Sequence, residues 1–258
     1  MNRFIKYIHK TTMKKFYTET LLKKTAYSKK GVLILMYHSI TDNNLSTYPY
    51  AIKKEHFEEQ IRFLSENFNM ISLNQGFEML KNNDNMLKNK PYCIITFDDG
   101  FKNNYTVAYP ILCKYNAPFT IFLTTNYIDQ NNESYLNWED VLKMCQNPLA
   151  NFGAHTLNHM NLNALEKKDI ENEIIQSKEI IESKLSKKVD FFAYPGGSHN
   201  QTAVNIVKNN FIAGLKDRIG NDHFNYFALD RISIDKKNEN FKEFLVSLAL
   251  SNFLTPGV

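Results

Sequence analysis

Short apolar segments alternate with amphipathic helical patterns along almost the whole chain of 258 residues. The clearest apolar segments lie at residues 31–37, 92–97 and 119–123, and none of them has a polar face. Strands that are apolar on both faces are typical of a parallel sheet that is covered by helices. This alternation constrains the fold more than any other feature of the sequence, and it predicts an α/β protein.

The other strand-like segments are shorter and lie at residues 70–73, 152–154, 191–194, 211–215 and 229–234. Apolar residues at helical spacing lie between the strands, at residues 57–68, 77–80, 107–112, 138–145, 169–185, 203–207 and 241–253. The absence of a Gly-x-Gly-x-x-Gly motif after any strand disfavours a dinucleotide fold, and the absence of a phosphate-binding P-loop motif excludes that class. We therefore expect a single distorted (β/α)7-type barrel with parallel strands, whose chemistry lies at the carboxyl ends of the strands.

Charge is distributed unevenly along the chain. Residues 1–30 hold nine basic residues and one acid, a net charge of +8, so residues 31–258 carry −4 of the total of +4. We interpret residues 1–30 as a basic N-terminal arm and residues 31–258 as one domain. The mildly acidic domain argues against a nucleic-acid partner, whereas the arm suits an anionic membrane surface.

The arm lacks the apolar run of a cleaved signal peptide, and no later stretch is long and apolar enough to cross a bilayer. We therefore expect a cytoplasmic protein. Two interpretations of the arm remain open at this point. It forms an amphipathic helix at the inner face of the membrane, or it forms a solvated helix that caps the domain or a frayed terminus.

Two adjacent carboxylates follow the apolar segment 92–97, in the sequence Asp98-Asp99-Gly100. Buried carboxylates are costly unless a positive charge lies beside them. The segment 152–154 is likewise followed by His155 and His159, and two histidines at this spacing can bind one metal ion. One carboxylate with two histidines leaves coordination positions open for water and substrate, which is typical of a catalytic metal site.

Two further strand ends carry polar or turn-forming residues. After residues 191–193 the chain continues as Tyr194-Pro195-Gly196-Gly197, in which the glycines permit close approach to a ligand and a free backbone N–H can face a developing oxyanion. His38 follows the first apolar segment. In a barrel, the end of this first strand lies beside the other strand ends.

These motifs resemble those of the polysaccharide deacetylases, the family-4 carbohydrate esterases that share the nodulation-type (NodB-like) deacetylase domain. Residues 96–100 (Thr-Phe-Asp-Asp-Gly) match the first motif, residues 155–159 (His-Thr-Leu-Asn-His) the second, and residues 194–197 resemble the third. Residues 136–139 and 152–155 also match the sequence that usually precedes the second motif in this family. The resemblance covers about residues 31–235 and places the domain within 31–258.

The resemblance implies a role for each matching residue. Asp98 would be the general base, and Asp99, His155 and His159 would hold a divalent metal. Gly196 would donate its N–H to the oxyanion, with Tyr194 and Pro195 beside it. Zinc suits this ligand set best, and cobalt, nickel or manganese would also bind.

Two departures point to a subgroup. The family's third motif often has arginine two residues before the proline, where this chain has Ala193, and Leu229-Asp230-Arg231 stands where a Leu-x-His motif would supply the general acid. In both departures the chain resembles the circularly permuted poly-N-acetylglucosamine deacetylases. Those enzymes carry the acid histidine on the first strand in a Tyr-His-x-Ile motif, which Tyr37-His38-Ser39-Ile40 matches here. His38 is then the candidate acid, with His199 as the alternative. Arg231 is the candidate arginine that orients Asp98.

The resemblance therefore implies a hydrolase that removes N-acetyl groups from an N-acetylated sugar or glycan and releases acetate. An N-acetylated glycan or a lipid-linked sugar is the expected partner. Two alternatives remain open at this point. The chain is a hydrolase of another C–N amide or of an O-acetyl ester on the same scaffold, or it is a non-catalytic carbohydrate-binding descendant.

Overall fold

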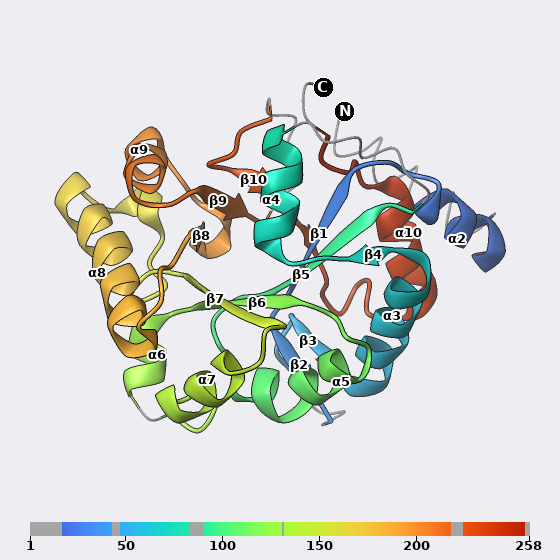
Figure 1. Cartoon of the computed structure of the whole chain (residues 1–258), viewed down its shortest axis with the longest axis horizontal. Coiled ribbons are helices and arrows are strands. Elements are labelled where there is room, and N and C mark those ends of the chain that lie inside the picture. The colour runs from blue at the N-terminus through green and yellow to red at the C-terminus, as the bar shows by residue number, and fades with distance from the viewer. Residues whose placement is uncertain (1–16, 43–46, 83–89, 131, 218–223, 256–258) are drawn as a thin grey trace.

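A computed structural model describes residues 17–42, 47–82, 90–130, 132–217 and 224–255 of the chain (Figure 1). Helices surround a central set of strands in this structure (Figure 1). Every residue of the strands at 32–37 and 119–123 is buried, as expected for strands with helices outside and packed side chains within. The α/β class predicted from the alternating pattern is confirmed.

All of the described strands except β2 and β3 form one parallel sheet, which curls into a nearly closed barrel (Figure 1). Its strands, in the order of their hydrogen-bonded neighbours, are β10 (Leu229–Asp230), β9 (Ala213–Lys216), β8 (Phe191–Ala193), β7 (Ala150–Ala154), β6 (Phe119–Leu123), β5 (Tyr92–Phe97), β1 (Val32–Tyr37) and β11 (Ile232–Ser233). A short strand, β4 (Asn69–Met70), also pairs with β5. All of these pairings are parallel, so the carboxyl ends of the strands meet on one side of the barrel.

The barrel closes through the segment 229–233. The apolar pattern predicted one strand over residues 229–234, and the structure corrects this prediction by dividing the segment in two. β10 pairs with β9 at one edge of the sheet, whereas β11 pairs with β1 at the other edge. Only Arg231 separates the two strands. Because this one segment pairs with both edge strands of the sheet, β10 and β11 together act as the seventh strand of the predicted (β/α)7-type barrel.

Helices follow most strands, and they are α2 (Glu19–Tyr27), α3 (Lys54–Asn67), α4 (Leu73–Asn82), α5 (Tyr109–Lys114), α6 (Thr125–Asp129), α7 (Trp138–Cys145), α8 (Lys167–Leu185), α9 (Gln201–Asn210) and α10 (Phe241–Leu250). The longest, α8, buries Ile170, Ile174 and Ile181 at the helical spacing seen in the sequence. A single turn of π-helix at Asn104–Ala108 precedes α5. Within the described residues, no helix has the length and apolar character that crossing a membrane requires.

Some elements were not predicted from the sequence. Residues Ser39–Thr41 (β2) and Ala51–Lys53 (β3) form a small two-stranded sheet beside the end of β1. Short helical turns at Leu162–Ala164 and Pro195–Gly197 follow β7 and β8. Elements of two to five residues are too short for a periodic pattern to identify them.

Only part of the basic arm can be described. Residues 1–16 lie outside the described residues, so the interpretation of that stretch as membrane-binding stays a prediction. Residues 19–27 form α2, which packs against α10 and buries Leu22 and Ala26 completely. Thr18 caps this helix, because its hydroxyl accepts a hydrogen bond from the backbone N–H of Leu21.

Candidate active site

Asp98 and Asp99 follow β5 at the carboxyl ends of the strands. The backbone N–H of Asp98 donates to the Tyr37 carbonyl at 3.0 Å, so the ladder between β1 and β5 continues to this residue. Both carboxylates are buried, at 2% and 6% exposed. Asp99 has a φ of 72°, a left-handed conformation that aspartate tolerates better than most residues. This turn ends the strand and leaves both acidic side chains inside the site.

His155 and His159 follow β7, which is separated from β5 in the sheet by β6. The Nδ1 atom of His155 lies 2.8 Å from the carbonyl oxygen of Ala193. Because a carbonyl can only accept, Nδ1 carries the proton and Nε2 keeps its lone pair. Burial lowers the pKa of His155 to about 4, although the Asp98 and Asp99 carboxylates oppose this shift. The ring is therefore neutral at pH 7, which is the form that binds metals.

Asp99, His155 and His159 together form a set of metal-ligand atoms. The Nε2 atoms of His155 and His159 lie 3.5 Å and 3.3 Å from Asp99 Oδ1, and all three ligand atoms lie within 4.8 Å of one another. Asp99 Oδ1 is buried and makes no hydrogen bond within the described residues. His155 Nε2 has no proton to offer this oxygen. Lone pairs that converge in a buried site are stable only around a positive charge, so the residues fit a divalent cation.

The loop that carries both histidines is held from behind by Glu173, a buried residue of α8. Its carboxylate accepts hydrogen bonds from the backbone N–H of Asn158 at 2.9 Å and from the Asn158 side chain at 2.7 Å. Asn126 also donates to Asn158, at 2.6 Å. Glu173 was not predicted from the sequence, because one acidic residue in a charged helix gives no signal of its own.

The same loop contains two residues with positive φ, Thr156 at 68° and His159 at 57°. A β-branched residue such as Thr156 adopts this conformation rarely and at a cost in free energy. The Thr156 hydroxyl accepts a hydrogen bond from the His159 N–H at 3.0 Å, which fixes the tight turn. Strain held in place in this way is typical of functional sites.

Arg231 extends from the closing segment of the barrel into its interior and contacts Asp98. Its two terminal nitrogens donate to both carboxylate oxygens of Asp98, at 2.7 Å and 2.6 Å. It also donates to Thr96 Oγ1 at 3.2 Å and to the Lys216 carbonyl at 3.3 Å. Arg231 is 1% exposed, so the pair lies entirely inside the protein. This is the contact predicted for Arg231, made by a residue between two strands.

The charge of Arg231 sets the ionisation of Asp98. Burial by itself would raise the pKa of the Asp98 carboxyl, but the guanidinium of Arg231, with smaller contributions from His155 and His38, lowers that pKa to about 2. The bidentate geometry is the strongest form of this interaction. Asp98 is therefore a carboxylate at any pH near neutrality, and its orientation is fixed.

His38 lies in the same site. It follows β1 where Tyr37 pairs with Phe97, so His38 stands beside Asp98 across the two strands. Its ring packs 4.6 Å from that of Tyr50, and its Nδ1 atom is buried without a hydrogen bond in the described part of the chain. The Asn104 side chain donates to the His38 carbonyl at 2.6 Å and fixes the backbone there.

The turn after β8 has one exposed residue, Gly196, whose φ is 57°. A Cβ atom added to Gly196 would contact no other atom, so the space beside this residue is open. Tyr194 and Pro195 are buried. The Tyr194 N–H donates to Leu215 O, and its hydroxyl donates to Phe227 O. Tyr194 and Pro195 therefore shape the turn, and the position open to a substrate is Gly196.

His199, the alternative acid, lies beyond this turn. Its Nδ1 is 2.9 Å from Gly197 O, and its ring packs against Tyr194 at 4.9 Å. It lines a separate polar cavity of about 220 Å³ together with Lys216 and Asn225. The ring of His199 is therefore engaged with its own turn, whereas His38 stands beside Asp98 at the strand ends.

An arc of aromatic rings runs along one side of the site and was not predicted. Tyr48 packs against Phe101 at 5.2 Å, Phe101 stacks on Tyr135 at 5.1 Å, and Tyr135 packs against Tyr127 at 4.5 Å. Tyr127 then stacks on His159 at 6.4 Å. The four aromatic residues of the arc are half-buried. Partly accessible aromatic rings beside polar groups are typical of ligand sites, but isolated aromatics in the sequence are more often core residues.

Comparisons with known proteins agree with this geometry. Residues 86–213 match the family model described as polysaccharide deacetylase. A Bacillus subtilis protein assigned by name to the polysaccharide deacetylases, YxkH, is 31% identical over 176 residues, which are 68% of this chain and 60% of that protein. The chain therefore matches less than two thirds of the length of YxkH. The poly-beta-1,6-N-acetyl-D-glucosamine N-deacetylase of Staphylococcus epidermidis is 28% identical over 217 residues, covering 74% of this chain and 73% of that enzyme.

Solved structures share the same fold. The Streptococcus pyogenes deacetylase PplD, determined in complex with acetate, superposes with a TM-score of 0.75 at 26% identity, covering 84% of this chain and 97% of that one. IcaB from Ammonifex degensii superposes with a TM-score of 0.71 at 21% identity, covering 86% and 98% of the two chains, and shows likeness of fold.

Proposed function

The chain belongs to the polysaccharide deacetylase family, and on this premise we propose that it is a metal-dependent hydrolase that removes N-acetyl groups from a glycan and releases acetate. The observation that carries the proposal is the convergence of Asp99, His155 and His159 beside the buried pair of Asp98 and Arg231. A non-catalytic descendant has no need to keep such a costly group of buried charges.

Asp99, His155 and His159 would hold the metal, and neutral imidazoles with a carboxylate suit zinc, with cobalt, nickel or manganese also able to bind. When bound, a divalent cation polarises the acetyl carbonyl and acidifies the attacking water. Asp99 Oδ1 already points at both histidines, so these three residues need little rearrangement to bind it.

Asp98 would accept the proton of the attacking water. Its carboxylate is ionised, because its pKa is lowered to about 2, and its Oδ2 atom lies 3.9 Å from His155 Nε2. Arg231 holds both oxygens in place, so the remaining lone pairs face a fixed direction. A carboxylate this weakly basic would need a water of lowered pKa, and a divalent cation held by Asp99, His155 and His159 would supply that chemistry.

His38 would donate the proton that makes the sugar amine a good leaving group. Its position beside Asp98 and its buried, unpaired Nδ1 support this role over His199. Gly196 would donate its backbone N–H to the tetrahedral oxyanion, since it is exposed at the end of β8 and leaves open space for a ligand. No covalent intermediate with the protein is required.

The relatives support the proposed substrate class. The Staphylococcus epidermidis relative is named for poly-beta-1,6-N-acetyl-D-glucosamine, and we propose an N-acetylated glycan for this chain as well. Acetate release should be measured from N-acetylated and O-acetylated sugars, and ring opening from cyclic amides, with and without a chelator. We expect chelator-sensitive acetate release from the N-acetylated sugars and none from Asp98→Asn. Full activity in Asp98→Asn would contradict the assignment of the base.

A further inference from the structure

A widened helical turn follows β5 within a few residues. Residues 102–114 form one helix, and Asn104–Ala108 within it form the π turn. The backbone N–H of Tyr109 donates to the carbonyl of Asn104, five residues earlier. Pro110 accounts for this geometry, because it lacks an N–H and its ring would collide with the carbonyl four residues earlier in a regular α-helix. Single π turns inside α-helices occur frequently at functional sites.

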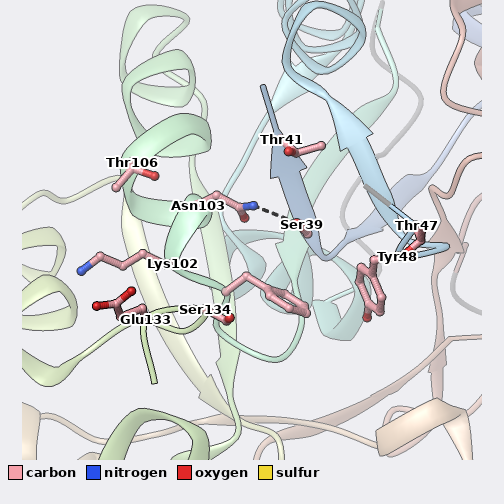
Figure 2. Close-up of a pocket in the computed structure, with 10 residues that line it drawn as sticks. Ser39, Thr41, Thr47, Tyr48, Lys102, Asn103, Thr106, Glu133 and Ser134 are labelled. Atoms are coloured by element: carbon pink, nitrogen blue, oxygen red, sulfur yellow. Dashed lines mark hydrogen bonds between the residues drawn. The ribbon is translucent and has the colours of Figure 1, made fainter. Parts of the chain in front are cut away.

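Two successive residues at the start of this turn, Asn103 and Asn104, hold the segment that follows β1. The Asn103 side chain accepts a hydrogen bond from the Ile40 N–H at 3.1 Å and donates to Ser39 Oγ at 2.8 Å. Figure 2 shows the second of these contacts, which reaches from the helix to β2. The Asn104 side chain donates to the His38 carbonyl at 2.6 Å. The asparagine pair, Asn103 and Asn104, therefore binds three consecutive residues.

The two members of the asparagine pair make different kinds of contact. Asn104 is 1% exposed, and it must present its NH₂ group to the His38 carbonyl, because a carbonyl can only accept. Asn103 presents its oxygen to a backbone N–H and its nitrogen to the hydroxyl of Ser39, and a hydroxyl can also donate. A carboxylate could therefore replace the amide of Asn103 but not that of Asn104.

The position of the His38 ring depends on the backbone that carries it. The ladder between β1 and β5 ends just before His38, with Tyr37 opposite Phe97. Nδ1 of His38 is buried and has no hydrogen bond among the residues that the structure describes, and the ring packs 4.6 Å from that of Tyr50. Since no hydrogen bond to Nδ1 fixes the ring, its place follows the backbone of residue 38, which Asn104 holds.

We propose that the asparagine pair positions His38 relative to Asp98 for transfer of a proton to the leaving amine. This inference rests on the proposed function, in which His38 is the acid, and deepens it by adding two positioning residues. The pair lies four and five residues after Asp99, so it joins the turn that carries both carboxylates to the segment that carries the acid. A displacement of about 1 Å at a reacting group can lower a rate about 100-fold.

The same substitution should have opposite effects at the two positions. Asn104→Asp sets an acceptor against the His38 carbonyl, so we expect kcat for acetate release from an N-acetylated sugar to fall by about 10–100-fold. Asn103→Asp is the conservative variant, because its carboxylate still accepts from the Ile40 N–H and can accept from the Ser39 hydroxyl. Its kcat should stay within about threefold of the wild-type value.

Asn103→Leu removes both contacts of this half-buried residue and should resemble Asn104→Asp in its loss of kcat. Asn209→Asp, at an exposed position of α9, is the matched control for the added charge and should change nothing. A kcat near the wild-type value in both Asn104→Asp and Asn103→Leu, or equal losses in Asn103→Asp and Asn103→Leu, would overturn the inference.

Action through His38 is tested by combining the substitutions with His38→Gln. In that background Asn104→Asp and Asn103→Leu should lower kcat by less than about twofold, because the acid that they position is gone. KM for the sugar should stay within about twofold in the single variants, since the substrate contacts are kept. A loss of kcat in His38→Gln as large as that in the wild type would mean a general effect on the fold, and would contradict the inference.

Hydrogen exchange tests the asparagine pair without catalysis. The Ile40 N–H is held by Asn103 Oδ1, so its exchange measured by NMR should be slow in the wild type and in Asn103→Asp. It should be at least about tenfold faster in Asn103→Leu. This pattern supports the placement of the segment by Asn103 even if no acetate is released, an outcome that would contradict only the proposed function. Fast exchange of the Ile40 N–H in the wild type would overturn the inference.

Discussion

Arg231 donates to both carboxylate oxygens of Asp98, at 2.7 Å and 2.6 Å, and this pair joins the segment that closes the barrel to the end of β5. The same guanidinium lies 5.4 Å from the ring of Phe122 on β6 and bonds to Thr96 on β5. One buried side chain therefore links the closure of the fold to the carboxylate proposed as the base. Stability and chemistry should respond together when it is changed.

Arg231→Met removes the charge and keeps an apolar side chain of similar length. We expect the free energy of unfolding to fall by about 3–5 kcal/mol, because the Asp98 carboxylate remains buried without its partner. Without the guanidinium the pKa of Asp98 rises from about 2, so the acid limb of the pH–rate profile moves to higher pH. Urea denaturation and acetate release against pH measure the two effects. Arg62→Met, at an exposed arginine of α3, should change neither.

The metal-free protein should lose stability in acid through His155. Burial lowers the folded-state pKa of His155 to about 4, from an ordinary value of 6.5. The unfolded chain therefore takes up a proton between pH 6.5 and pH 4 where the folded protein does not, and stability falls as the pH falls through this window. A shift of this size corresponds to about 3 kcal/mol.

Urea denaturation of the chelated protein, above and below this window, measures the effect. His155→Gln should show a smaller loss of stability over the same window, because the substituted side chain does not titrate. An equal pH dependence in the wild type and the variant would contradict the assignment to His155.

Glu173→Ala should loosen the loop that carries the two metal-site histidines. The substitution removes two hydrogen bonds to Asn158, and partners of this kind behind metal ligands typically contribute about 10–100-fold to metal affinity. Zinc affinity measured by competition with a chromogenic chelator should fall by a factor in this range. Glu171→Ala, at an exposed position of the same helix, is the control. Unchanged zinc affinity in Glu173→Ala would mean that the loop keeps its shape without the two hydrogen bonds to Glu173.

His38→Gln should lower kcat for acetate release by about 10²–10⁴, the usual contribution of a general acid. The zinc affinity should stay at the wild-type value, because His38 is not part of the Asp99, His155 and His159 set. His199→Gln serves as the comparison and should stay within a few-fold of the wild type. The opposite pattern would assign the acid to His199.

Most of the site followed from one local property of the sequence. Polar residues stood directly after apolar segments, as with Asp98 and Asp99 after 92–97 and His155 after 152–154. Because the carboxyl ends of parallel strands meet on one side of a barrel, residues distant in sequence could be placed together. The resemblance then separated Asp98 from Asp99 in role, which the spacing could not do.

Other parts depended on contacts between distant segments. The predicted strand at 229–234 was wrong as a single strand, since an apolar pattern reports burial and not which neighbour a strand pairs with. Glu173 and the aromatic rings beside the site gave no pattern at all. Their place depends on how α8 and the loops pack around the barrel.

The sequence by itself determined the α/β class, the buried parallel strands and the strand ends that carry the carboxylates and histidines. Local periodicity reports which segments are buried strands and in which direction they run, and this information is enough to predict the fold class and the strand ends. Only the tertiary structure decided that Arg231 stands at the junction of the two edges of the sheet, with its charge against Asp98. Closure of a barrel joins residues that share no local pattern, so their partnership exists only in the folded protein.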